Sequence, residues 1–81
     1  MSKNKYIIKV ITKIYVDYFV EEYYKGIDDN DNVVLTDDLA EAAMFEDEET
    51  CDRIIEHLYV LLDYMPRIIL KEKFFYVNPK L

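Results

Sequence analysis

A stretch of twenty residues, from Lys5 to Tyr24, constrains the fold most, because it is rich in β-branched and aromatic residues and has no glycine, proline or asparagine. This composition is typical of strands, and one strand usually has about 5–6 residues, so the stretch must fold back on itself. A loop at residues 12–14 places Lys9 opposite Asp17 and leaves the other hairpin face wholly apolar, so we predict this register. The charged face also exposes four apolar residues: Ile7, Ile11, Tyr15 and Phe19.

The middle of the chain predicts a third strand and a short helix. Residues 33–35 are a short apolar run that follows the one clear polar loop, at residues 26–32. Thr36 is a suitable N-cap, and two aspartates follow it where the helix dipole favours anions. The short helix is expected at residues 39–44. Its predicted core-facing side chains are Leu39, Ala42 and Ala43.

The main helix is predicted to begin near Asp47, a second N-cap residue, and to end near Met65, because Pro66 disfavours helical geometry in the residue before it. Its apolar side chains recur at helical spacing. They are Cys51, Ile54, Ile55, Leu58, Leu62 and Met65. Residues 67–77 return to strand composition. The predicted fold is α+β: an antiparallel sheet, made of the N-terminal hairpin plus the C-terminal strand, packed against one main helix and one short helix.

Length and composition predict a single intracellular domain, residues 1–81. A chain of 81 residues has room for one small core. Its one cysteine, Cys51, cannot form an internal disulfide, so an oxidising compartment is not implied. The longest apolar run, Leu58 to Leu62, is far shorter than the roughly 18 residues of a membrane span. We therefore expect a cytoplasmic protein without a membrane partner.

The net charge of -7 is distributed very unevenly along the chain. Residues 1–16 carry +4, residues 17–63 carry -14 and residues 64–81 carry +3. Such a field disfavours direct binding of nucleic acid to the middle of the chain and favours a protein partner with a basic surface. The alternative is an acidic face that only keeps the protein in solution.

The chain offers few groups for metal binding or catalysis. An EF-hand loop beginning at Asp28 needs glycine and glutamate at positions where this chain has Val33 and Leu39, so residues 28–32 predict a polar turn instead. The only histidine, His57, falls on the outer helix face, and Cys51 falls on the apolar stripe as a small core residue. We expect no metal, no cofactor and no enzymatic activity.

Two kinds of surface remain as candidates for binding. The acidic middle block can contact a basic partner, or imitate the phosphate backbone in a nucleic-acid channel, with two tyrosines as aromatic anchors. The residues predicted to bind the partner are Asp17, Glu21, Glu22, Tyr23, Tyr24, Asp28, Asp29, Asp31, Asp37 and Asp38. Alternatively, the chain is a homodimer rather than a monomer, joined by the hairpin face or by a stripe on the outer helix face. That stripe is His57, Val60 and Tyr64.

The run Val-Val-Leu-Thr-Asp-Asp-Leu-Ala-Glu-Ala-Ala-Met-Phe, at residues 33–45, precedes an acidic turn and Cys-Asp-Arg-Ile-Ile. With the leading Lys-Tyr-Ile-Ile-Lys-Val strand, this pattern resembles small phage-encoded proteins of Gram-positive hosts. The shared motifs are structural: a cap, an alanine-containing packing turn and Phe45 as an anchor.

The resemblance implies a setting, the host cytoplasm, in which short acidic proteins inhibit host enzymes or defence nucleases, as anti-CRISPR proteins do. We therefore expect a non-enzymatic acidic protein-binding module that acts as a phage-type inhibitor. The alternative is a homodimeric structural module with no inhibitory role.

Overall fold

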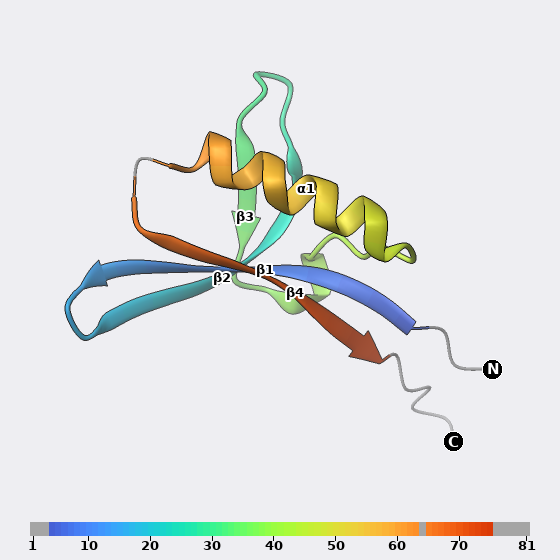
Figure 1. The fold of residues 1–81 in the computed structure, drawn as a ribbon, viewed down its shortest axis with the longest axis horizontal. Helices are drawn as coiled ribbons and strands as arrows, with labels where there is room; N and C mark the ends of the chain where they lie inside the picture. The colour runs from blue at the N-terminus through green and yellow to red at the C-terminus, as the bar shows by residue number, and fades with distance from the viewer. Residues whose placement is uncertain (1–3, 64, 76–81) are drawn as a thin grey trace.

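The computed structural model describes residues 4–63 and 65–75 and shows an α+β domain, in which one face of a four-stranded antiparallel sheet carries the main helix (Figure 1). The strand order is β3-β2-β1-β4, so the N-terminal hairpin forms the middle of the sheet and β4 lies at one edge. The elements are β1 (Asn4–Tyr15), β2 (Tyr18–Ile27), β3 (Val33–Thr36), η1 (Leu39–Glu41), α1 (Glu48–Leu61) and β4 (Arg67–Phe75). The predicted fold class is confirmed.

The β1–β2 hairpin turns at residues 16–17 and not at the predicted loop, residues 12–14, so the predicted register is wrong. Lys9 pairs with Tyr23 instead of the predicted aspartate. The reason is β4, which pairs with β1 residue by residue from Asn4 to Thr12 and therefore needs an unbroken strand there. The two registers differ by six residues, an even number, so side chains up to Lys13 and from Phe19 onward keep their predicted face of the sheet, whereas a register shift between Lys13 and Tyr15 pairs Tyr15 with Tyr18 at the tip.

The core lies between α1 and the sheet face that carries the even-numbered residues of β1. Ile8 and Val10 are fully buried there, in one cluster with Cys51 and Leu58 of α1. The other buried members of the cluster are Tyr24, Leu62 and Ile69. The predicted helix stripe thus faces the sheet, and Cys51 is a core residue as predicted. Burial raises the pKa of the Cys51 thiol, which favours its protonated, unreactive form.

Helix α1 begins at the predicted cap and ends earlier than predicted. The Asp47 side chain accepts a hydrogen bond from the backbone N–H of Glu49, one of the groups that a helix start leaves unsatisfied. The last helical residue is Leu61, and the backbone N–H of Leu62 still donates to the carbonyl of Leu58. The helix therefore stops a few residues before Pro66 imposes any restriction.

The predicted short helix is a single 3-10 turn, η1. Its N-cap is Asp38 and not the predicted Thr36, which ends β3 and accepts a hydrogen bond from the backbone N–H of Asp38 through its hydroxyl. Leu39, predicted to face the core, is exposed, whereas Ala42 is buried. A turn of three residues is too short to present a helical stripe to the core.

Phe45 pairs with Tyr6 of β1, beyond the last β1–β2 pair, which is Lys9 with Tyr23. Its backbone N–H and carbonyl exchange hydrogen bonds of 2.8 and 2.7 Å with Tyr6 of β1. Its ring stacks on that of Tyr24, with the ring centroids 6.3 Å apart. This contact fixes the chain between η1 and α1 against the sheet.

Two projections leave the body of the domain at separate ends. Past the last β1–β4 pair, Thr12 with Arg67, the β1–β2 hairpin continues as a two-stranded ribbon, residues 13–20, which we call the arm. Figure 1 shows the arm extending beyond α1 on the left and the β2–β3 loop at the top. Strand β2 leads from one to the other through a register shift at Gly26, whose φ of 158° favours glycine.

Candidate interaction surfaces

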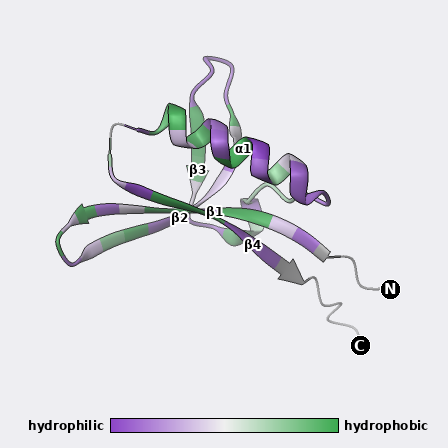
Figure 2. Ribbon diagram, viewed as in Figure 1, coloured by the Kyte–Doolittle hydropathy of each residue, from purple (hydrophilic) through white to green (hydrophobic). Residues whose placement is uncertain are grey.

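The loop between β2 and β3, residues 28–32, holds three exposed aspartates and is called the acidic loop below. Asp28 orders the loop, because its Oδ1 accepts hydrogen bonds of 2.9 Å from the backbone N–H groups of Asn32 and Asn30. These bonds, that from Asn32 first, lower the pKa of the Asp28 carboxyl. Asp31 has a φ of 63°, a left-handed conformation that aspartate tolerates. The predicted polar turn is therefore confirmed, and Figure 2 shows it as hydrophilic throughout.

The other predicted acidic residues do not join the acidic loop in one surface. Asp17 lies at the tip of the arm, Glu21 and Glu22 lie along β2, and Asp37 and Asp38 lie in the turn before η1, so the predicted acidic residues are spread over several parts of the fold (Figure 1). The Asp38 carboxylate is engaged locally, since its Oδ1 accepts a hydrogen bond from the backbone N–H of Ala40. The predicted residues therefore form separate small clusters.

The two predicted aromatic anchors lie on opposite faces of β2. Tyr24 is a buried member of the core cluster, so its predicted role as an exposed anchor is corrected. Alternation along β2 explains this, because Tyr24 and Glu22 share the face that α1 covers, whereas Tyr23 points to the other face. Tyr23 and Glu22 are half-buried.

The sheet face opposite α1, the outer face, combines a small ion-pair network with apolar side chains. The Lys9 ammonium lies 2.9 Å from a carboxylate oxygen of Glu72 and 3.1 Å from one of Glu21, and these two groups, Glu72 first, raise the pKa of Lys9. Ile7, predicted to be exposed on this face, is buried. Beside the network lie four apolar side chains, called the outer row below: Ile11, Phe19, Ile68 and Leu70.

The arm is apolar and largely open to solvent. Tyr15 is 73% exposed and Val16 is 79% exposed. The other exposed apolar side chains of the arm are Ile14, Tyr18 and Phe19. The sequence predicted only two of these five on a contact face, because it placed residue 14 in a loop and Val16 and Tyr18 on the apolar face of a shifted hairpin. The apolar residues on both sides of Asp17 were the available signal for an exposed apolar tip.

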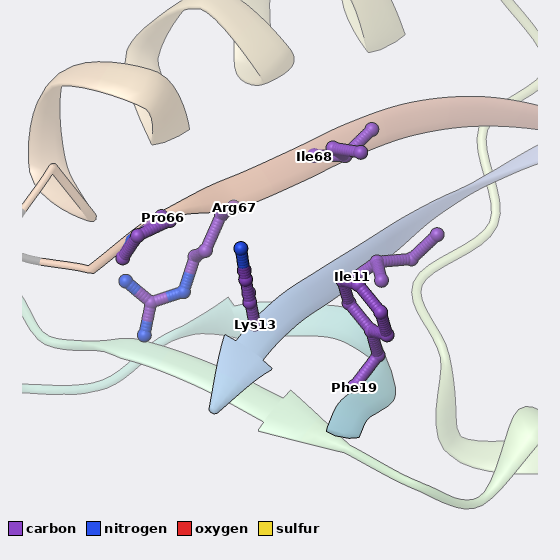
Figure 3. A pocket seen from close by; sticks show the side chains of 6 residues that line it. All are labelled: Ile11, Lys13, Phe19, Pro66, Arg67 and Ile68. Carbon is purple, nitrogen blue, oxygen red and sulfur yellow. The ribbon is translucent and has the colours of Figure 1, made fainter. Parts of the chain in front are cut away.

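A shallow hollow of about 170 Å³ opens between the arm and the start of β4. Its lining residues are Ile11, Lys13, Phe19, Pro66, Arg67 and Ile68. Figure 3 shows the Phe19 ring beside Ile11, with Ile68 of β4 across from them. The walls are thus mostly apolar, with the charged groups of Lys13 and Arg67 toward one end.

The predicted stripe on the outer face of α1 is small. His57 and Val60 are exposed, the latter to 69%, and Tyr64 lies outside the described residues. Two acidic side chains near this stripe in the sequence are also exposed: Glu56 on α1 and Asp63, two residues after the helix ends.

Carboxylates in the first two turns of α1 form contacts with the sheet of the same chain. The Lys71 ammonium of β4 lies 2.9 Å from an oxygen of Asp52 and 3.1 Å from one of Glu48, and both carboxylates, Asp52 first, raise the pKa of Lys71. The Tyr6 hydroxyl donates a 2.9 Å hydrogen bond to the other Glu48 oxygen, which raises the pKa of Tyr6. These carboxylates fix the start of α1 to β1 and β4.

We expect the protein to lose stability in acid as its local carboxylate contacts are protonated. The pKa of Asp47 is lowered by hydrogen bonds from the Thr50 hydroxyl and the Glu49 N–H, and that of Glu48 by Lys71 and then Tyr6. Since these groups, like Asp28, have lower pKa values folded than unfolded, their contribution is complete above the ordinary pKa values of 3.8 for aspartate and 4.5 for glutamate and disappears as pH falls through the folded values.

Urea unfolding at several pH values checks this expectation. The midpoint should be constant between about pH 7 and pH 5 and should fall below about pH 4. The variant Asp47→Asn keeps an N-cap acceptor without a titrating group, so its midpoint should depend less on pH in acid. A midpoint that rises as the pH is lowered would contradict the assignment.

Among residues 4–63 and 65–75 no three histidine, cysteine, aspartate or glutamate side chains gather closely enough to hold a metal ion. Within the same residues no helix has both the length and the apolar character needed to cross a membrane. No protein-family model matches the chain, and neither a curated protein nor a solved structure matches it. The resemblance to phage-encoded proteins thus remains a prediction.

Proposed function

We propose that the chain is a protein-binding module that uses the acidic loop to contact a basic surface of its partner. The observation that carries this proposal is that the carboxylates of Asp29 and Asp31 are exposed and have no partner among the described residues. Both are exposed on a loop that Asp28 holds in shape, and neither forms an ion pair with any residue that the structure describes.

The contrast with the other acidic groups supports the choice of this loop. Glu21, Glu48 and Asp52 pair with lysines of the same chain. Asp38 caps η1, and Asp47 caps α1. Those carboxylates have internal structural roles. The acidic loop presents its charge at the end of a projection, where a basic partner can reach it from several directions and where electrostatic steering speeds association. Inhibition of a host nucleic-acid-binding or defence enzyme is the narrower form of this proposal.

Neutralising the loop without changing its shape tests the proposal. The double variant Asp29→Asn/Asp31→Asn removes two charges, keeps Asp28 and keeps a residue that accepts the left-handed conformation at position 31. The immobilised chain is used to capture proteins from a lysate of cells that produce it, at low and at high salt. We expect a captured basic protein whose affinity falls about tenfold in the variant and whose binding weakens with salt.

The matched control is Glu56→Gln/Asp63→Asn. It makes the same change in net charge on exposed residues that do not belong to the acidic loop. It should leave capture unchanged within about twofold. Equal losses in both variants would show that only net charge matters, and capture unaffected by the loop variant would overturn the proposal.

A further inference from the structure

We infer that the arm and the outer row form the contact surface of a homodimer, in which each copy is the other's partner. This inference is independent of the acidic loop, which projects from another part of the molecule (Figure 1). It selects the hairpin and not α1 as the surface for self-association.

The first argument is the size and nature of the exposed apolar surface. Beyond Thr12 the arm is a two-stranded ribbon, and such ribbons are marginally stable unless something packs against them. The exposed parts of the arm, counted over both faces of the ribbon, and of the outer row together amount to on the order of 700 Å², close to the roughly 800 Å² that each partner buries in a standard interface. The members that contribute are Ile14, Tyr15, Val16, Tyr18, Phe19, Ile68 and Leu70.

The second argument is shape, since the arm has a hollow at its base and aromatic side chains of a size that fits such a hollow at its tip. The hollow beside Phe19 has a volume of about 170 Å³ (Figure 3), and an apolar cavity of roughly 150 Å³ is enough to accept benzene. Tyr15 and Tyr18 form an exposed pair at the arm tip, with their ring centroids 6.5 Å apart. A two-fold axis brings the tyrosines of each copy to the hollow of the other.

The third argument is charge, which opposes contact between copies over most of this acidic protein but not at the arm. Residues 10–20 contain one base, Lys13, and one acid, Asp17, and so carry no net charge. Neither forms an ion pair with a described residue of its own chain. In a two-fold arrangement Lys13 of each copy can pair with Asp17 of the other. An anionic lipid surface is a poorer occupant, because it would be repelled by the net charge of -7 and would bury Asp17 at the tip.

Sedimentation equilibrium of the full chain, from about 5 to 500 μM, tests the inference. We expect a species of twice 9.8 kDa at the higher concentrations. The variant Val16→Lys places a charge at the most exposed of the large apolar residues of the arm and should raise the dimer dissociation constant at least tenfold. Because Val16 is 79% exposed, the variant should fold normally, which circular dichroism and a urea midpoint will verify.

The matched control is Val60→Lys, the same change at a residue of α1 that is 69% exposed. It should leave the dissociation constant unchanged. A dimer that is broken by Val60→Lys and not by Val16→Lys would place the interface on α1 and overturn the inference. A wild-type chain that stays monomeric to 500 μM would overturn it too, and co-sedimentation of that monomer with phosphatidylcholine vesicles would identify a lipid surface as the occupant.

A charge exchange tests the two-fold pairing. Lys13→Asp puts four acids at the interface of two copies and should weaken the dimer at least tenfold, and Lys13→Asp/Asp17→Lys should restore it. If the double variant stays as weak as the single one, the proposed pairing is wrong. Since none of these variants alters the acidic loop, capture of a basic partner by Val16→Lys separates this inference from the proposed function.

Discussion

Leu58→Ala should lower the free energy of unfolding by about 3 kcal/mol, more than any exposed substitution in the chain. Leu58 is 1% exposed and lies in the last turn of α1, in the cluster formed with Ile8 and Val10. Removing its branched end leaves a cavity that the sheet cannot fill, so the loss of apolar transfer is joined by the loss of packing contacts. A domain of 81 residues has about 5–10 kcal/mol of stability in total, so the variant should unfold at a clearly lower urea concentration.

The control for this effect is Leu61→Ala, on the same helix. Leu61 is 38% exposed and belongs to no buried cluster among the described residues, so its truncation should cost less than about 1 kcal/mol. Helix propensity is the same in both variants, because each replaces leucine by alanine. Equal midpoints for the two variants, measured by circular dichroism in urea, would mean that α1 packs through a different face.

Local sequence signals predicted the helix well because its determinants are local. Asp47 caps its own helix through the N–H two residues later, and the stripe from Cys51 to Leu62 needs only helical spacing to face one way. The same holds for the polar turn at residues 28–32. In each case the deciding interactions lie within a few residues of one another.

The hairpin turn was mispredicted because a distant segment decides it. Opposite charges favoured a turn at residues 12–14, but pairing with β4 keeps β1 extended to Thr12 and moves the turn to residues 16–17. Lys9 then finds two carboxylates, and one of them, Glu72, comes from β4. Nothing near Lys9 in the sequence indicates this partner. Outside the hairpin tip, the predicted face of each residue in the hairpin survived the error, because alternation depends only on parity.

The burial of a single candidate residue and the grouping of candidate residues into surfaces depend on different information. Alternation alone would have placed Tyr24 on the buried face with Ile8, and this signal was available in the sequence. The separation of Asp17 from the acidic loop was not available, because it depends on the path of β2 past Gly26. Likewise, the outer row exists only because β4 lies beside β1, which brings Ile68 opposite Ile11.

Arg67→Met should lower the free energy of unfolding by about 2 kcal/mol, because Arg67 connects three elements of the fold. Its Nε donates a 3.1 Å hydrogen bond to the hydroxyl of Thr12, which is 4% exposed, and a terminal nitrogen donates a 2.7 Å bond to the carbonyl of Leu62. The second bond satisfies a carbonyl at the end of α1, where a positive charge also complements the helix dipole. Methionine keeps much of the apolar stem and removes both donors, so the buried hydroxyl and the carbonyl lose a charged partner.

The chain has one other arginine, which provides a matched control. Arg53 pairs with Glu49 on the outside of α1, both side chains are more than 70% exposed, and Arg53→Met should therefore change stability by less than about 0.5 kcal/mol. A double-mutant cycle with Thr12→Val measures the share of the Arg67 effect that passes through the hydroxyl, and we expect a coupling of about 1 kcal/mol. If Arg67→Met and Arg53→Met have the same urea midpoint, Arg67 does not link α1 to the sheet. A large Arg67 effect with no coupling to Thr12 would assign the stabilisation to the helix end alone.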